Sequence, residues 1–186
     1  MLLFEVDGTD SSAREAAEQI MKVCAPIALS ISLAESEKKM ADIWAARKLV
    51  GAAVSRLDPT KSRIYVGEDV GVPIKQIPEL LKRVQEIAEK FDLPAMKYGH
   101  IGDGNLHLAL FIDVLNKDEW DRLNKAADLV HRTAIELGGT VSSEHGVGAA
   151  RAEYMKAQWG PALEVMRAIK KTLDPKGILN PGKLGL

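Results

Sequence analysis

The chain has 186 residues, of which 46% are hydrophobic and 27% charged, as in an ordinary globular domain with one core. Its 25 Lys and Arg against 26 Asp and Glu give a net charge of −1 without a basic run, which argues against binding to nucleic acid or anionic membranes. The single cysteine, Cys24, excludes an internal disulfide, and no segment approaches the roughly 20 apolar residues that span a bilayer; we therefore expect a cytoplasmic protein, with any membrane association made through partners.

The apolar pattern predicts an alternation of strands and helices. In chain order we expect a strand at 2–6, a helix at 13–23, a strand at 27–33, helices at 35–57 and 77–91 with a strand at 63–66 between them, two strands within 95–113, a helix at 120–137, a short strand at 140–143, and two helices between 146 and 173 broken at Gly160-Pro161. This order indicates an α+β fold with an antiparallel or mixed sheet covered by helices. A core strand directly after Met1 suggests that the chain is part of a longer protein.

Two of the four histidines flank a glycine-rich turn in the stretch HIGDGNLH, His100 to His107. If residues 102–105 form a four-residue turn, His100 lies directly opposite His107 with the Cβ atoms about 4.5–5.5 Å apart. At that separation two imidazoles can bind one cation. The alternative is an ordinary hairpin whose glycines serve the turn. A phosphate loop is disfavoured, because this Gly-x-Gly joins two strands and opens no helix.

The stretch SSEHGVG contains two further candidate site residues, Glu144 and His145. A catalytic divalent site commonly adds a carboxylate to histidines and leaves one position open for substrate or water. Because neighbouring residues cannot easily bind one ion in the same way, we expect one of the pair to ligate and the other to act as an acid or base. The alternative is that Glu144 is a helix N-terminal acid and His145 a surface residue. His131 lies on an otherwise ordinary helix and is interpreted as structural.

Arg47 falls within the apolar stripe of the predicted helix 35–57, three residues after Trp44 and three before Val50. An inward guanidinium must be paired, because an unpaired buried charge costs several kcal/mol. Its planar fork suits a carboxylate, which belongs either to a buried Asp or Glu or to a small-molecule acid. The candidate metal site in the same chain favours the small acid.

Five stretches together resemble the C-terminal domain of the FAD-linked 2-hydroxyacid dehydrogenases, which include D-lactate dehydrogenases, the glycolate oxidase flavoprotein subunit and D-2-hydroxyglutarate dehydrogenase. The stretches are WAAR (44–47), EDVGVP (68–73), YGHIGDGNLHL (98–108), SSEHGVGAAR (142–151) and LDPKGILNPGKL (173–184). The resemblance covers nearly the whole chain, with the stretches in the expected order. The resemblance implies that residues 1–186 form a ferredoxin-like α+β substrate and cap domain, which normally follows an N-terminal FAD-binding domain absent from this sequence.

The same resemblance implies a role for each candidate residue. His100, His107 and Glu144 would bind zinc or manganese, and His145 would be the general base. Arg47 would hold the substrate carboxylate, and Asn105 would line the pocket. Asn180 and Lys183 would lie in a tail that folds toward the flavin. Relatives that act on dicarboxylates carry a basic residue near the position of Gly67, so glycine there favours a small monocarboxylate such as lactate or glycolate. The implied reaction is transfer of hydride from a D-2-hydroxyacid to FAD, for which the isolated chain would be inactive.

Two other functions compete with this interpretation. The chain could be a non-catalytic metal- or acid-binding subunit that complements a separately encoded FAD protein. It could also be a metallohydrolase that uses the same histidines and a metal-bound water, although Arg47 in an apolar stripe argues against hydrolysis. The expected partners are the 2-hydroxyacid and an FAD-binding domain or subunit, and a second copy of the chain is a further candidate.

Overall fold

The computed structural model describes residues 1–65 and 67–186, which form two compact units, Met1–Val50 and Gly51–Leu186. Val66, the last residue of the predicted strand 63–66, lies outside the described residues. No helix in the described part of the chain is long and apolar enough to cross a membrane.

The first unit contains two helices, α1 (Asp10–Cys24) and α2 (Glu37–Lys48). The Thr9 and Ser36 side chains cap them by accepting hydrogen bonds from backbone N–H groups in the first turn. The predicted strands 2–6 and 27–33 are wrong: both segments are irregular, and their large apolar side chains are mostly exposed. A strand needs a neighbouring strand for its backbone hydrogen bonds, and within the described residues neither segment has one.

The second unit is built on a four-stranded antiparallel sheet, which confirms the α+β prediction. Its strands are β1 (Ser62–Ile64), β2 (Val70–Gly71), β3 (Ala95–Tyr98) and β4 (Asn105–Ile112), and β4 is the central strand because the other three all pair with it. A single antiparallel bridge joins Gly71 to Thr140 and replaces the strand predicted at 140–143. With β1 and β2 as one interrupted strand, the order along the chain is βαββαβ, and the bridged segment lies at the edge beside β2, which is the ferredoxin-like arrangement.

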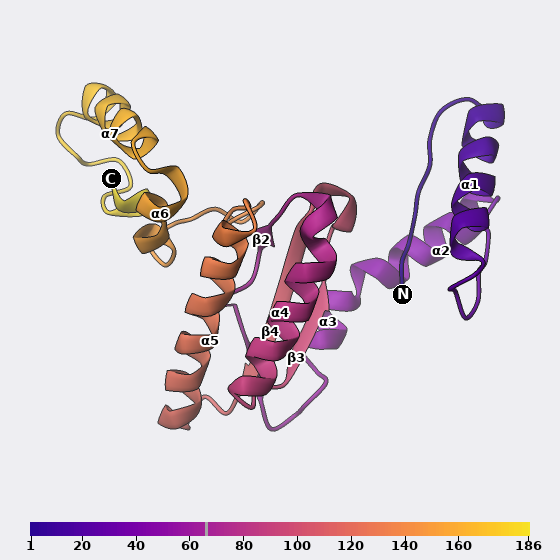
Figure 1. Cartoon of the computed structure of the whole chain (residues 1–186), viewed down its shortest axis with the longest axis horizontal. Helices are drawn as coiled ribbons and strands as arrows, with labels where there is room; N and C mark the ends of the chain where they lie inside the picture. The colour runs from indigo at the N-terminus through magenta and orange to yellow at the C-terminus, as the bar shows by residue number, and fades with distance from the viewer. Residues whose placement is uncertain (66) are drawn as a thin grey trace. The chain divides into compact units, whose positions relative to one another are not determined.

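Two long helices cover one face of this sheet, as Figure 1 shows. They are α4 (Ile77–Lys90) and α5 (Lys117–Glu136), close to the helices predicted at 77–91 and 120–137. Leu106, Leu108 and Leu110 of β4 pack with apolar residues of both helices in the main core. Successive strand residues point to opposite faces of a sheet, so Asn105 and His107 face away from the helices.

The remaining elements are short. α3 (Val50–Val54) follows α2 after a break at Leu49, so the long helix predicted at 35–57 is in fact two. The predicted break at Gly160-Pro161 is confirmed, because α6 (Met155–Trp159) ends before it and α7 (Ala162–Leu173) begins after it. The 3-10 turns are η1 (Ile74–Gln76), η2 (Ile101–Asp103), η3 (Ala152–Tyr154) and η4 (Lys183–Gly185).

Candidate metal and acid-base site

The candidate site residues gather at the start of β4, on the sheet face that α4 and α5 leave uncovered. Asn105 and His107 come from β4, and both are buried. Glu68 and Asp69 come from the segment between β1 and β2, and Ile64 pairs with Leu110 whereas Val70 pairs with Leu106. Six residue steps thus separate Ile64 from Val70, whereas four separate their partners on β4.

The predicted pairing of His100 with His107 is wrong, since the residue opposite His107 is Tyr98. β3 ends at Tyr98, and the loop after it folds back on itself because the His100 carbonyl accepts hydrogen bonds from the N–H groups of Asp103 (3.0 Å) and Asn105 (3.1 Å). Gly104 makes this path possible with a φ of +75°, a conformation that glycine adopts readily. The exposed His100 ring still lies near His107, with ring centroids 5.8 Å apart.

The structure brings His107 of β4 together with Glu144 and His145, which lie next to each other on a distant segment. His107 Nε2 is 3.0 Å from Glu144 Oε1, and His145 Nε2 is 3.5 Å from the same oxygen. The two imidazole rings stack with centroids 5.1 Å apart and an angle of 12° between their planes. The prediction that Glu144 and His145 end a short strand is wrong. Both lie in the irregular segment before η3.

Glu68 fixes the orientation of the His145 ring. Its Oε1 lies 3.1 Å from His145 Nδ1, and its Oε2 accepts a hydrogen bond of 2.9 Å from Arg63 Nη2. Nδ1 is thus the ring nitrogen that faces the Glu68 carboxylate, and Nε2 faces the Glu144 carboxylate. The side chains of Arg63 and Glu68 are 6% and 3% exposed, so the guanidinium compensates a buried charge.

Asp69 binds the segment that carries Glu144 and His145. Its carboxylate accepts hydrogen bonds from the Ser142 hydroxyl at 2.7 Å, from the Glu144 N–H at 3.0 Å and from the His145 N–H at 2.8 Å. Burial raises the pKa of the Asp69 carboxyl, but these hydrogen bonds outweigh burial, and the net pKa is lowered. Asp69 is therefore an ionised, buried acceptor.

Two of the three predicted ligands have a spacing that fits a divalent ion. The ligand atoms that lie within 4.8 Å of one another come from Asp69, His107, Glu144 and His145, so His100 is not in this group. Two ligand atoms that each lie about 2.0–2.2 Å from one ion are about 3–3.5 Å apart, which matches the 3.0 Å between His107 Nε2 and Glu144 Oε1. Burial lowers the pKa of His107. The nearby Glu68 and Glu144 carboxylates raise it, but burial has the larger effect and the net pKa is lowered. A lowered pKa favours the neutral imidazole, which is the form that binds metals.

The other predicted site residues lie elsewhere. Arg47 is partly buried on α2, a helix of the first unit that has no fully buried residue. Asn180 and Lys183 are exposed in the C-terminal tail. The Leu184 N–H donates a hydrogen bond of 2.8 Å to the Gly148 carbonyl, so the tail is attached to the segment that follows His145.

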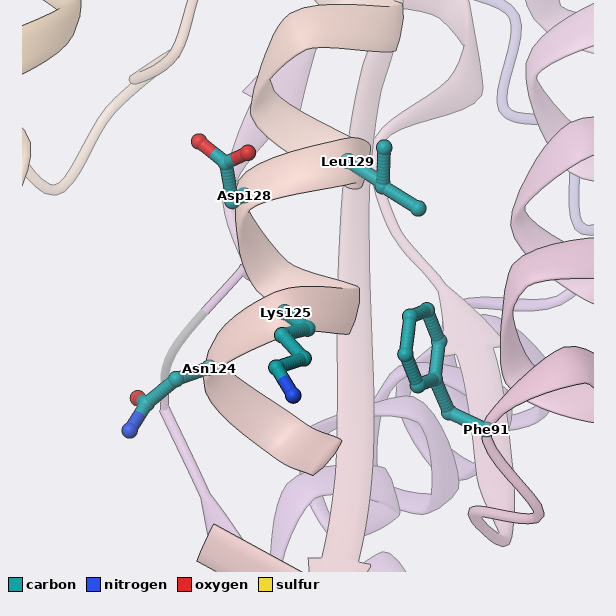
Figure 2. Close-up of a pocket in the computed structure, with 5 residues that line it drawn as sticks. All are labelled: Phe91, Asn124, Lys125, Asp128 and Leu129. Atoms are coloured by element: carbon teal, nitrogen blue, oxygen red, sulfur yellow. The ribbon is translucent and has the colours of Figure 1, made fainter. Parts of the chain in front are cut away.

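A shallow depression of 440 Å³ lies between the end of α4 and the surface of α5, as Figure 2 shows. It is lined by Phe91, Asn124, Lys125, Asp128 and Leu129. Its carboxylate, Asp128, already accepts hydrogen bonds from Arg132 and Tyr154. The depression therefore offers no acid-base or ligand group comparable with the cluster at the start of β4.

Sequence patterns alone gave no role to Glu68, Asp69, Arg63 or Arg151. Arg151 donates hydrogen bonds to the carbonyls of Gly146 and Glu68, at 2.7 and 2.9 Å, and so joins the two segments of the site. One signal was present: the acidic pair Glu68-Asp69 directly precedes the apolar Val70. Two adjacent carboxylates beside a buried strand must find donors, and such a pair is a candidate site component.

Comparison with known proteins identifies the family of the chain. The family described as FAD linked oxidases, C-terminal domain, matches residues 1–184. The chain is 37% identical over 186 residues to "Glycolate oxidase subunit GlcD" of Bacillus subtilis, covering 99% of this chain and 39% of that protein. It is 34% identical over 159 residues to "D-2-hydroxyglutarate dehydrogenase" of Stutzerimonas stutzeri, covering 82% of this chain and 32% of the relative.

A solved structure has a similar fold. It is a 4-ethylphenol oxidase from Gulosibacter chungangensis, with a TM-score of 0.63 and 19% identity over 96% of this chain and 37% of the other. The chain thus spans less than two fifths of the length of the proteins that it matches. The family match over nearly every residue, together with the two relatives, shows that the chain belongs to the C-terminal domain family of the FAD-linked oxidases.

Proposed function

We propose that the chain is the substrate- and metal-binding part of a flavin-dependent D-2-hydroxyacid dehydrogenase or oxidase of the lactate or glycolate class. His100, His107 and Glu144 would hold a divalent ion, zinc or manganese. The observation that carries the proposal is the 3.0 Å separation of His107 Nε2 and Glu144 Oε1 beside the oriented ring of His145. The names of the relatives, a glycolate oxidase subunit and a D-2-hydroxyglutarate dehydrogenase, support this substrate class.

The residues of the chain would divide the chemistry between them. When bound, the ion supplies Lewis acidity toward the hydroxyacid and the flavin accepts the hydride. His145 would accept the hydroxyl proton at Nε2, the ring nitrogen that does not face Glu68. Arg47 binds the substrate carboxylate through its planar fork, and this assignment rests on the family resemblance. Asn105 lines the pocket, and its Oδ1 has no hydrogen-bond partner among the described residues.

Gly67 supports a monocarboxylate substrate. Its φ is +79°, and a Cβ atom there would lie 3.1 Å from the Ala127 Cα. A basic side chain at this position would therefore be strained and crowded. The second carboxylate of a dicarboxylic acid would lack that partner, so we expect lactate or glycolate to be turned over with a higher kcat/KM than 2-hydroxyglutarate.

The flavin would be bound mainly outside this chain, which matches only 39% of the B. subtilis relative. Asn180 and Lys183 are the proposed flavin-facing residues of the tail. We therefore expect the purified 186-residue chain to fold without oxidising lactate or glycolate. Lactate or glycolate oxidation by the chain without an added flavoprotein would contradict this division.

Metal analysis tests the proposed site directly. The wild-type chain, loaded with zinc or manganese and then desalted, should retain the ion, whereas His107→Ala should lose most of it because one ligand and the Glu144 contact disappear. His131→Phe is the matched control, since His131 is equally buried but lies on α5 outside the site. Equal metal content in His107→Ala and the wild type would rule out the proposed ligand set.

A further inference from the structure

Asp69 is a fully buried carboxylate to which the proposed reaction assigns no role. It is 0% exposed, directly precedes β2 and has a φ of +64°, a conformation that residues other than glycine rarely adopt. Strained backbone of this kind persists where the surrounding structure holds it in place. The hydrogen bonds of Asp69 show what that surrounding structure is.

Five donors converge on the Asp69 carboxylate. They are the Asn105 amide at 3.0 Å, the Ser142 hydroxyl at 2.7 Å, and the successive backbone N–H groups of Ser143, Glu144 and His145 at 3.2, 3.0 and 2.8 Å. A carboxylate offers about four lone-pair directions, so Asp69 is saturated. Although its oxygens lie within 4.8 Å of the ligand atoms of His107, Glu144 and His145, it has no free electron pair for a metal.

The Asp69 carboxylate accepts the backbone hydrogen bonds of the site segment, which in a strand would be made by a neighbouring strand. Residues 142–145 form no helix or strand, and beyond these bonds the Ser143 N–H also donates to the Asp69 carbonyl at 2.9 Å. Three consecutive N–H groups directed at one anion form a backbone nest. The positions of the Glu144 carboxylate and the His145 ring therefore follow from the position of the Asp69 carboxylate.

We propose that Asp69 is a positioning residue that assembles the metal and acid-base site by holding the Ser142–His145 segment through its backbone. The proposal rests on the proposed metal site, because its effect is expressed through Glu144. Asp69→Asn keeps the shape of the side chain but replaces one acceptor oxygen with a donor NH2 group, which faces N–H groups. We expect zinc to bind the full chain about 10–100-fold more weakly in this variant.

The experiment is zinc titration by calorimetry, together with amide NMR spectra, on the full 186-residue chain. Asp174→Asn is the matched control: Asp174 is also a buried aspartate that accepts two backbone N–H bonds, from Ile178 and Leu179 in the tail. The control should lose stability without losing zinc affinity. In Asp69→Asn the amide proton signals of Ser143, Glu144 and His145 should shift, because their carboxylate partner is gone.

The possible outcomes separate the two proposals. Unchanged zinc affinity in Asp69→Asn, with tight binding by the wild type, would overturn the positioning role and leave the metal site intact. If the wild type does not bind zinc, the proposed metal site is refuted. In that case the positioning role is judged from the NMR spectra alone, and unshifted amide signals of residues 143–145 in Asp69→Asn would overturn it. If Asp69→Asn does not fold, Ser142→Ala removes one donor from the same carboxylate, and zinc affinity equal to that of the wild type would refute the proposal.

Discussion

His131 gives a quantitative prediction about pH and stability. The residue is 3% exposed on α5, its ring lies 4.6 Å from that of Tyr154, and neither ring nitrogen has a hydrogen-bond partner among the described residues. Burial, reinforced by the positive charge of Arg151, lowers the pKa of His131 from 6.5 to about 4. The folded protein therefore keeps this ring neutral at pH values at which the unfolded chain protonates it.

The sign follows from proton binding in the two states. Between pH 6.5 and about 4 the unfolded chain binds more protons at His131 than the folded chain does, so the free energy of unfolding falls as the pH falls. Each pKa unit corresponds to about 1.4 kcal/mol, and the full difference amounts to about 3 kcal/mol. Above pH 6.5 the contribution of His131 is constant, and below about pH 4 it stops changing.

The assay is urea unfolding at several pH values between 4.5 and 7.5, followed by tryptophan fluorescence. A Trp44→Phe background leaves Trp120 and Trp159, which both report on the unit Gly51–Leu186. His131→Phe should flatten the dependence, and the difference between the two proteins cancels the contribution of other groups. His100→Phe replaces an exposed histidine and should leave the slope unchanged. Parallel curves for His131→Phe and its parent across pH 4.5–6.5 would refute the reasoning.

Three further predictions concern the site, the core and the loop. In the FAD-linked protein proposed above, Glu68→Gln should lower kcat about tenfold or more with little change in KM, because an NH2 group would replace one of the two oxygens that face Arg63 and His145. An unchanged kcat would contradict the role of Glu68. Leu123→Ala, at a 0% exposed position, should lower the free energy of unfolding by about 2–5 kcal/mol, whereas Leu115→Ala, at 88% exposure, should change it by less than about 0.5 kcal/mol in urea unfolding. Gly104→Ala places a Cβ atom 2.0 Å from the Val72 carbonyl oxygen and should weaken both zinc binding and stability. Gly102→Ala is the control, because a Cβ atom there meets no atom within 4 Å. Equal effects of the two substitutions in calorimetry would argue against a strained loop.

The sequence by itself determined the long elements of the second unit. α4 and α5 were predicted at 77–91 and 120–137 because apolar residues recur there at helical spacing, and this signal is local. Apolar runs without such context were misleading: residues 2–6 and 27–33 have strand-like composition but no strand partner in the described structure. Strand formation depends on a second segment that local pattern does not reveal.

The ligand types were likewise readable, because histidines and carboxylates clustered in short stretches, HIGDGNLH and SSEHGVG. Only the tertiary structure decided how these stretches meet. It placed Tyr98, and not His100, opposite His107, because the loop closes on the His100 carbonyl. It also assigned the buried carboxylates of Glu68 and Asp69 to His145 and to the backbone of the site segment. Such contacts join residues more than 70 positions apart. A buried carboxylate must be paired with nearby donors, and which donors are nearby is decided only when the chain has folded.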